Sequence, residues 1–142
     1  MARIRIKLPD FFPFTTLLPV RITDLNYGGH VGNDAILSLL HEARVQFLGQ
    51  YGYSELELGG TSLIMGDVAI EFKKEIFYGN RLRASVAAGE FTRVGFDLFY
   101  KLELGEGEKW LPAVLAKTGM VCFDYTAKKV AAVPEPVLRA LS

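Results

Sequence analysis

The sequence predicts an α+β domain in which one long helix is wrapped by a five- to six-stranded antiparallel sheet. Residues 33–50 follow the pattern of a single amphipathic helix, whereas residues 63–125 follow the pattern of four strands joined by short turns. Strands joined by short turns pair antiparallel, and a helix with one apolar stripe needs an apolar surface to cover that stripe. A sheet that wraps the helix meets both requirements within one domain, residues 1–142.

Before the helix, the pattern indicates an edge strand and then an irregular loop. Thr15–Thr23 is rich in β-forming residues, but Pro19 cannot donate to a sheet ladder. We therefore expect this strand at an edge of the sheet. Asp24–Asn33 contains three glycines in ten residues, a density typical of a loop.

The helix is predicted to begin at Asn33 and Asp34, which supply capping and first-turn acidic chemistry, and to end near Gln50, before Gly52. At 100° per residue its apolar side chains fall on one stripe, so the helix must lie against a large apolar surface. The residues of the stripe are Ile36, Leu40, Ala43, Phe47 and Tyr51.

Three polar side chains of the helix are placed differently around this stripe. His41 and Glu42 lie far from its centre, so neither is expected in a core, whereas Arg44 lies close to it. A buried arginine needs a partner, and we expect a carboxylate from Asp24 or from the neighbourhood of Glu42.

Beyond the helix, every long segment has the pattern of a strand, and a short terminal helix is expected after Pro134. In the third of these strands apolar residues alternate strictly with others, the period of a sheet with one buried face. The predicted strands are Leu63–Ile76, Arg81–Phe91, Val94–Leu104 and Lys109–Tyr125.

The composition excludes several classes of function. Lysine and arginine number 16, as do aspartate and glutamate, so no net positive field is available to hold nucleic acid. The one cysteine, Cys122, cannot form a disulfide within the chain, and no histidines and cysteines have the spacing of a zinc site. Residues 1–7 alternate charge with isoleucine, unlike a secretion signal, and no apolar run is long enough to span a membrane. We expect a cytoplasmic protein that needs no metal and does not insert into membranes.

The loop and the start of the helix carry a specific pattern. It reads Asp-x-(Asp/Asn)-x-x-Gly-His-Val-x-Asn and is followed by His41–Arg44, where the matching family often has Glu-Glu-Ala-Arg. With this pattern the chain resembles the hotdog-fold acyl thioesterases of the 4-hydroxybenzoyl-CoA thioesterase-like group. The matching residues are Asp24, Asn26, Gly29, His30, Val31 and Asn33.

A second stretch, Ile70–Asn80, resembles the strand of this family that ends in a Gly-Asp turn. In plant-type acyl carrier protein thioesterases the similar strand carries a catalytic glutamate, and Glu75 takes its place. The sequence departs from the family at Asn26, where many members have a catalytic aspartate.

The resemblance implies hydrolysis of an acyl thioester, carried by coenzyme A or by acyl carrier protein, to a free acid and a thiol. Water attacks the carbonyl directly, and no cofactor is implied. Glu75 is the candidate base, and His30 and Asn26 are candidates for orienting the water or the thioester. Asp24 is either a displaced base or a cap of local backbone amides. The resemblance further implies that two protomers share the site, in a homodimer or a dimer of dimers.

Glycines in the loop and backbone N–H groups at the start of the helix suit a thioester carbonyl. Such N–H groups lack helical partners and lie at the positive end of the helix dipole, where they stabilise an oxyanion. The candidate substrate-binding residues are Tyr27, Gly28, Gly29, Val31, Gly32 and Asn33. The basic residues Lys73, Lys74, Arg81 and Arg83 either meet the phosphates of coenzyme A or an acidic carrier protein, or form a charged sheet edge.

The same residues have ordinary structural interpretations. His30 alone would be a turn histidine bonded to backbone, Asn26 an Asx-turn residue and Glu75 a solvated charge at a strand end. The missing loop aspartate favours a rival function, a non-catalytic hotdog module that binds acyl thioesters or mediates assembly. A hotdog hydratase or dehydratase has no matching motif. Cys122 lies in an apolar strand, as a buried hydrophobe would and a nucleophile would not.

Overall fold

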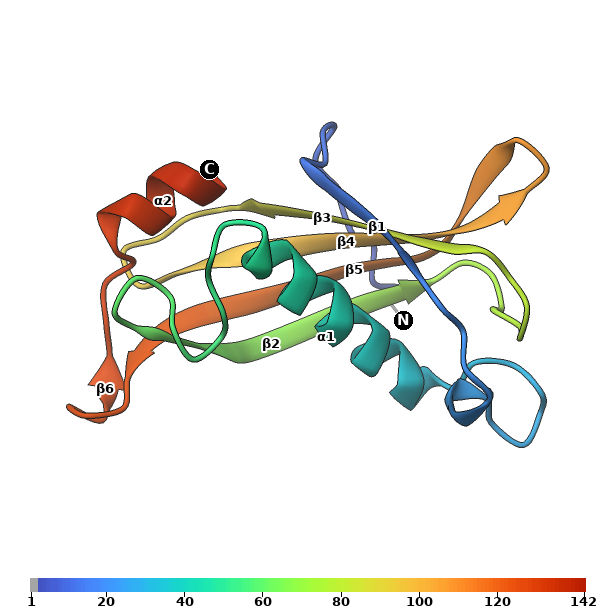
Figure 1. Cartoon of the computed structure of the whole chain (residues 1–142), viewed down its shortest axis with the longest axis horizontal. Helices are drawn as coiled ribbons and strands as arrows, with labels where there is room; N and C mark the ends of the chain where they lie inside the picture. The colour runs from blue at the N-terminus through green and yellow to red at the C-terminus, as the bar shows by residue number, and fades with distance from the viewer. Residues whose placement is uncertain (1–2) are drawn as a thin grey trace.

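In the computed structural model, which describes residues 3–142, the chain folds into a six-stranded antiparallel sheet and two helices (Figure 1). The five long strands lie in the order β1-β3-β4-β5-β2, and β6 pairs with β5. The elements are β1 (Phe14–Leu18), a 3-10 turn η1 (Ile22–Asp24), α1 (Asn33–Gly49), β2 (Ser62–Phe72), β3 (Leu82–Gly89), β4 (Gly95–Glu106), β5 (Lys109–Asp124), β6 (Lys129–Val130) and α2 (Glu135–Leu141).

The predicted order and antiparallel pairing of elements are confirmed, and the differences lie at strand ends. β1 is at an edge of the sheet, as expected, but it stops at Leu18 because Pro19 cannot continue the ladder. β2 stops at Phe72, four residues before the predicted end, because the chain leaves the regular ladder there. The two-residue strand β6 was not predicted, since its pattern is too short to detect.

Helix α1 has 17 residues and packs its apolar stripe against one face of the sheet (Figure 1). Phe47 and Ala43 on this stripe are fully buried, and the rings of Phe14 and Tyr51 pack edge-on against Phe47. Burying a side chain of this size stabilises a fold by about 1.5–3 kcal/mol, so the stripe holds α1 on the sheet.

Arg44 enters the core beside this stripe. Its Nη1 donates to the Tyr100 hydroxyl over 3.1 Å, and that hydroxyl lies 2.7 Å from Thr118 Oγ1. Its Nε lies 3.4 Å from Glu55 Oε2. The expectation of a carboxylate partner is confirmed, but naming Asp24 or the vicinity of Glu42 was wrong. Glu55 lies on the loop after α1, and only the return of that loop brings its carboxylate to Arg44.

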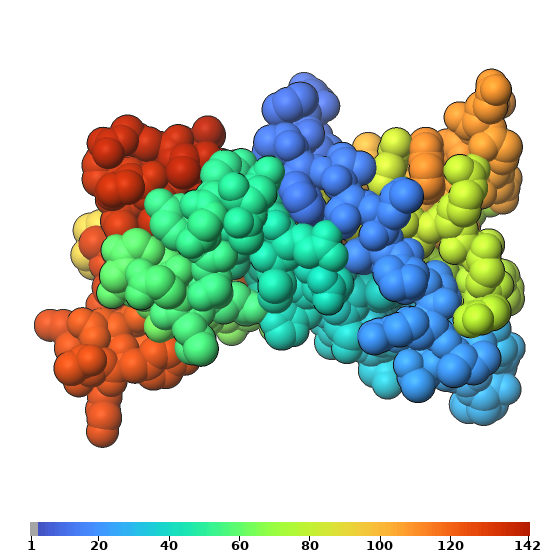
Figure 2. Space-filling view, viewed as in Figure 1, coloured from blue at the N-terminus to red at the C-terminus, as the bar shows by residue number. Residues whose placement is uncertain are grey.

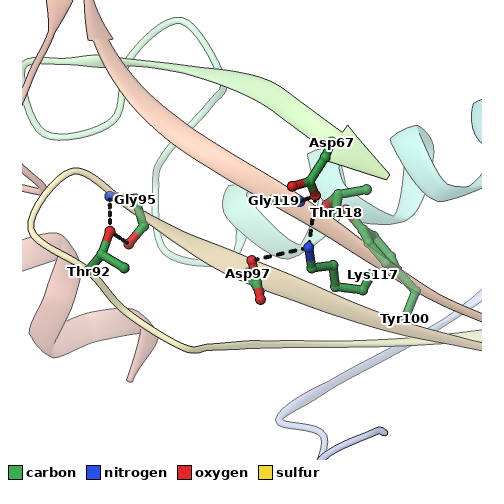
Figure 3. Close-up of polar contacts among 8 residues, drawn as sticks. All are labelled: Asp67, Thr92, Gly95, Asp97, Tyr100, Lys117, Thr118 and Gly119. Atoms are coloured by element: carbon green, nitrogen blue, oxygen red, sulfur yellow. Dashed lines mark hydrogen bonds and ion pairs between the residues drawn. The ribbon is translucent and has the colours of Figure 1, made fainter. Parts of the chain in front are cut away.

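The opposite face of the sheet is polar. Lys117 Nζ lies 2.8 Å from Asp67 Oδ1 and 3.9 Å from Asp97 Oδ1, so one cation links three strands (Figure 3). The Lys117 hydrogen bond holds the pKa of Asp67 below its ordinary value, whereas partial burial raises the pKa of Asp97. The alternation in β4 therefore separates a buried face from a polar face, as its sequence predicts.

A segment before β1, residues 3–13, runs across this polar face and is called the N-terminal arm below. Figure 1 shows it passing behind the sheet, on the side away from α1. The arm contacts two strands of this face, β2 and β4. The backbone N–H of Ile6 donates to Glu71 Oε1 on β2, and Lys101 Nζ of β4 lies 5.1 Å from the centre of the Phe12 ring.

Candidate functional site

The loop before α1 folds back on itself as a tight turn. Leu25 and Val31 form an isolated β-bridge, and the Asn26 N–H donates to the His30 carbonyl over 2.8 Å. Gly29, near the tip, has φ +83°, a conformation that glycine adopts at little cost. The turn thereby presents His30 on its return limb, immediately before α1.

This return limb pairs with the segment that follows β2. His30 and Phe77 form a β-bridge, and the Val31 N–H donates to the Ile76 carbonyl over 2.7 Å. The two segments lie side by side at one end of the molecule, where Figure 2 shows them as a blue and a yellow-green surface. Two stretches that the sequence singled out separately are therefore brought together.

His30 and Glu75 face each other across this contact. Their Nε2 and Oε1 atoms are 3.8 Å apart, which is longer than a direct hydrogen bond. His30 Nδ1 lies 3.2 Å from the Val31 carbonyl, an acceptor, so Nδ1 donates to this oxygen and Nε2 faces Glu75. The His30 side chain is 30% exposed and that of Glu75 64% exposed. Both groups remain accessible to water and to a substrate.

The orientation of Glu75 depends on an irregularity at the end of β2. The N–H groups of Lys73 and Lys74 both donate to the carbonyl of Ala113, so two successive residues oppose one residue of β5. Such an arrangement bends the strand and ends its strict alternation. Glu75 is thereby freed from the face that it would share with Glu71 in a regular strand, and its side chain faces His30.

A cavity of about 260 Å³ lies at this junction. Its walls come from the return limb of the loop, the first turn of α1, the end of β2 and one residue of β5. Its lining is part apolar and part charged, as expected for a site that takes an acyl group next to reactive polar atoms. The lining residues are His30, Val31, Asn33, Ile36, Phe72, Lys73, Lys74, Glu75, Ile76 and Val114.

The N-terminus of α1 opens onto this cavity. Gly32 is the N-cap residue, and no side chain among residues 3–142 forms a capping hydrogen bond there. A Cβ on Gly32 would lie 2.6 Å from Asp34 Oδ1, so a larger residue here would require the Asp34 side chain to move. The first-turn N–H groups lack helical partners and lie at the positive end of the dipole, beside the lining residue Asn33. They are suited to bind a carbonyl oxygen that becomes negative.

The other residues predicted for the site lie outside the cavity lining. Asn26 Oδ1 accepts a hydrogen bond from the Gly28 N–H over 2.9 Å, which is an Asx turn. Asp24 is buried, and its Oδ2 accepts from the Arg21 N–H over 2.8 Å. Tyr27 is fully exposed at the tip of the loop, next to Gly28 and Gly29. These residues shape the turn, whereas His30, Val31, Asn33 and Glu75 line the cavity.

Comparison with known proteins identifies the family. A family model described as the Thioesterase-like superfamily matches residues 20–141. The chain belongs to the Thioesterase-like superfamily. This membership confirms the predicted resemblance to hotdog-fold thioesterases and the prediction that the protein is a thioester hydrolase.

Similar proteins from three organisms agree with this assignment. A 1,4-dihydroxy-2-naphthoyl-CoA hydrolase of Microcystis aeruginosa is 28% identical over 119 residues, which cover 82% of this chain and 83% of that protein. The crystal structure of a 1,4-dihydroxy-2-naphthoyl-CoA thioesterase from Synechocystis has a TM-score of 0.78 at 24% identity, covering 90% and 94% of the two chains. A thioesterase from Thermus thermophilus, complexed with coenzyme A and Zn, has a TM-score of 0.79 at 20% identity, covering 92% and 98%. The six-stranded sheet with two helices is therefore the hotdog architecture of the superfamily.

Several lining residues of this superfamily member were not predicted as site residues. Ile36 was recognised only as part of the apolar stripe, and Phe72 and Ile76 only as parts of a strand. Val114 lies on β5, and nothing in its sequence context points to the site. Residues of this kind are found only when the strands are placed in space, because an apolar side chain facing a cavity has the same pattern as one in a core.

We expect Cys122→Ala to retain the thioesterase activity. Cys122 is fully buried, and burial raises the pKa of its thiol, so little of the nucleophilic thiolate forms near neutral pH. The measurement is thiol release by the variant and the wild type at equal concentrations of folded protein. A loss of turnover by more than about tenfold, with an unchanged circular dichroism spectrum, would point instead to a covalent mechanism.

Among residues 3–142 no three His, Cys, Asp or Glu side chains lie close enough together to hold a metal ion. The helices within the same residues are too short or too polar to cross a membrane.

Proposed function

We propose that this chain hydrolyses acyl-CoA thioesters by direct attack of water, with Glu75 as the general base. The observation that carries the proposal is the meeting of Glu75 and His30 at the N-terminus of α1, inside a cavity of about 260 Å³. The relative from Microcystis aeruginosa is named for a CoA thioester with an aromatic acyl group, which supports coenzyme A as the carrier. Acyl carrier protein is the alternative carrier.

In the proposed reaction, a water molecule lies between Glu75 Oε1 and His30 Nε2. The 3.8 Å separation of these atoms is too long for a hydrogen bond but suits a water that contacts both. Glu75 accepts one proton while the water oxygen forms a bond to the thioester carbonyl carbon. The tetrahedral intermediate then collapses, the carbon–sulfur bond breaks, and the thiolate takes up a proton, giving a free acid and a thiol.

The first-turn N–H groups of α1 stabilise the oxyanion in this scheme. Donors that are already oriented toward a developing negative charge contribute more than any other single factor in many acyl-transfer enzymes. Asn33 lies in this first turn and lines the cavity. Asn26 acts on the geometry only, because its side-chain oxygen is engaged in the Asx turn.

A second copy of the chain completes the site in this proposal. Strand β2 is an edge strand, and no strand among residues 3–142 pairs with its outer side. Met65, Val68 and Phe72 of β2 are 45%, 39% and 51% exposed. Exposed apolar edges promote pairing with another strand, and Phe72 also lines the cavity. Antiparallel pairing of two β2 strands would cover this edge and enclose Glu75.

We expect the protein to be a dimer or a dimer of dimers at micromolar concentration, measured by light scattering. Val68→Lys is expected to lower the apparent mass, because pairing would place a charge within the interface. Arg139→Ala, at an exposed position of α2 away from β2, is the control and keeps the wild-type mass. A monomeric wild-type protein would contradict this prediction.

A binding module without catalysis is the second candidate function, and one observation favours it. Asn26 stands where many members of the family have an aspartate, and an amide cannot accept a proton at neutral pH. In that case the cavity would bind an acyl thioester tightly without hydrolysing it.

The decisive experiment is release of free thiol from acetyl, medium-chain, long-chain and aromatic acyl-CoAs, with His30→Ala beside the wild type. Turnover that falls in the variant supports hydrolysis at this site. Binding of an acyl-CoA without release of thiol favours the binding module. Turnover of acyl carrier protein thioesters alone would identify the alternative carrier.

A further inference from the structure

A second hollow adjoins the site cavity on the side of the N-terminal arm. It has a volume of about 520 Å³ and is lined by residues 3–5 of the arm and residues 70–73 at the end of β2. Phe72 and Lys73 line both the hollow and the site cavity. The hollow and the site cavity are therefore neighbours at the end of β2.

The arm is held beside this hollow by one carboxylate. Glu71 Oε1 accepts the backbone N–H of Ile6 over 3.0 Å, and Glu71 Oε2 lies 2.9 Å from Lys73 Nζ. The Glu71 side chain is only 15% exposed. The hydrogen bond from Lys73 is the main cause that lowers the pKa of Glu71, followed by that from Ile6, so the carboxylate stays ionised at neutral pH. Glu71 acts as a positioning residue for the arm.

The hollow has a local excess of positive charge. Arg3, Arg5 and Lys73 line it, and Glu71 is its one acidic residue. Arg3 and Arg5 are exposed, and within residues 3–142 no carboxylate lies within ion-pair distance of either guanidinium. The chain as a whole has a formal net charge of zero, so this excess of positive charge is local to the hollow. Two available guanidinium groups beside a cavity are suited to bind phosphate.

We propose that this hollow binds the phosphorylated nucleotide end of coenzyme A, with Arg3 and Arg5 contacting its phosphates. The inference rests on the proposed function, because it names the carrier that the same site takes. The volume lies within the range of about 300–1,000 Å³ typical of small-molecule sites. A carrier protein, by contrast, needs an open basic surface, and the arm and β2 enclose this hollow on two sides.

The first test needs no catalysis. Adenosine 3′,5′-diphosphate carries phosphates of coenzyme A but no thioester, and its binding is measured by calorimetry. The double variant Arg3→Ala/Arg5→Ala is expected to bind this nucleotide about tenfold or more weakly, because each substitution removes a charged contact to phosphate. Lys7→Ala/Arg139→Ala removes the same charge from exposed positions outside the hollow and is expected to bind as the wild type does. Absence of binding to the wild type, or equal weakening in both double variants, would overturn the proposal.

The second test compares two thioesters with the same acyl group, one of coenzyme A and one of N-acetylcysteamine, which has no phosphate. In Arg3→Ala/Arg5→Ala the KM for the CoA thioester is expected to rise about tenfold with kcat nearly unchanged, because a ground-state contact is lost. The KM for the phosphate-free thioester is expected to stay the same. Equal increases for both thioesters would mean that the arm acts on the fold of the site, and would refute the phosphate subsite. Failure of the proposed function itself is distinct, since the wild type would then hydrolyse neither thioester while nucleotide binding is still measurable.

Discussion

Glu75→Gln is expected to lower kcat for thioester hydrolysis by about 10²- to 10⁴-fold, the usual contribution of a general base. Glutamine keeps the size of the side chain but cannot accept the proton of the attacking water. KM is expected to change little, because the proton transfer takes place in the transition state. The measurement is steady-state thiol release across a range of substrate concentrations.

Glu106→Gln provides the matched control for this variant. Glu106 and Glu75 line a common surface hollow, but Glu106 does not line the site cavity. The control therefore removes a nearby carboxylate and should retain wild-type kcat. If Glu75→Gln turned over substrate at the wild-type rate, Glu75 would not be the base, and Asp24→Asn would become the next variant to examine.

Glu55→Gln is expected to lower the free energy of unfolding by about 2–3 kcal/mol, because it leaves the buried charge of Arg44 without its carboxylate. The Arg44 side chain is 8% exposed, and its Nε has no hydrogen-bond partner besides this ion-pair contact. Glu55 is 26% exposed, so we place the effect below the range for fully buried pairs. The same carboxylate also lies 2.6 Å from Nε2 of His41. The measurement is unfolding in urea, read from the midpoint with the slope unchanged.

Glu57→Gln is the control for this second variant, two residues further along the same loop. Glu57 Oε1 accepts the Gly60 N–H over 2.8 Å, and glutamine retains that carbonyl acceptor. Its effect on the free energy of unfolding should stay within about 0.5 kcal/mol, as for most exposed positions. Equal stability of the two variants would show that Arg44 does not depend on Glu55.

Local patterns were enough to predict most of the fold. The spacing of apolar residues in α1 and their alternation in β4 indicate which side chains face the core. Glycines such as Gly79 and Gly107 mark the turns between strands. These signals act over a few residues and need no knowledge of distant segments. The predicted ends of β1 and β2 were wrong because each strand ends where its backbone hydrogen bonding stops, whereas the prediction followed the pattern of side chains.

The candidate site was predicted in part. His30 and Glu75 were named from the resemblance, and the strand pattern alone would have placed Glu75 on one face with Glu71. The double pairing of Lys73 and Lys74 with Ala113 ends that alternation. A bulge of this kind depends on the partner strand, so periodicity within one segment cannot reveal it.

By itself, the sequence determined the number, type and order of the main elements, the stripe that holds α1 on the sheet, and the family. These follow from short-range periodicity, turn residues and one continuous motif. Only the tertiary structure decided that Glu55 neutralises Arg44, that His30 faces Glu75, and that Asp24 and Asn26 serve the turn. The reason is physical: each of these contacts joins segments that meet only after the loop, the sheet and the helix have packed. Such a contact produces no periodic pattern of residues within either segment.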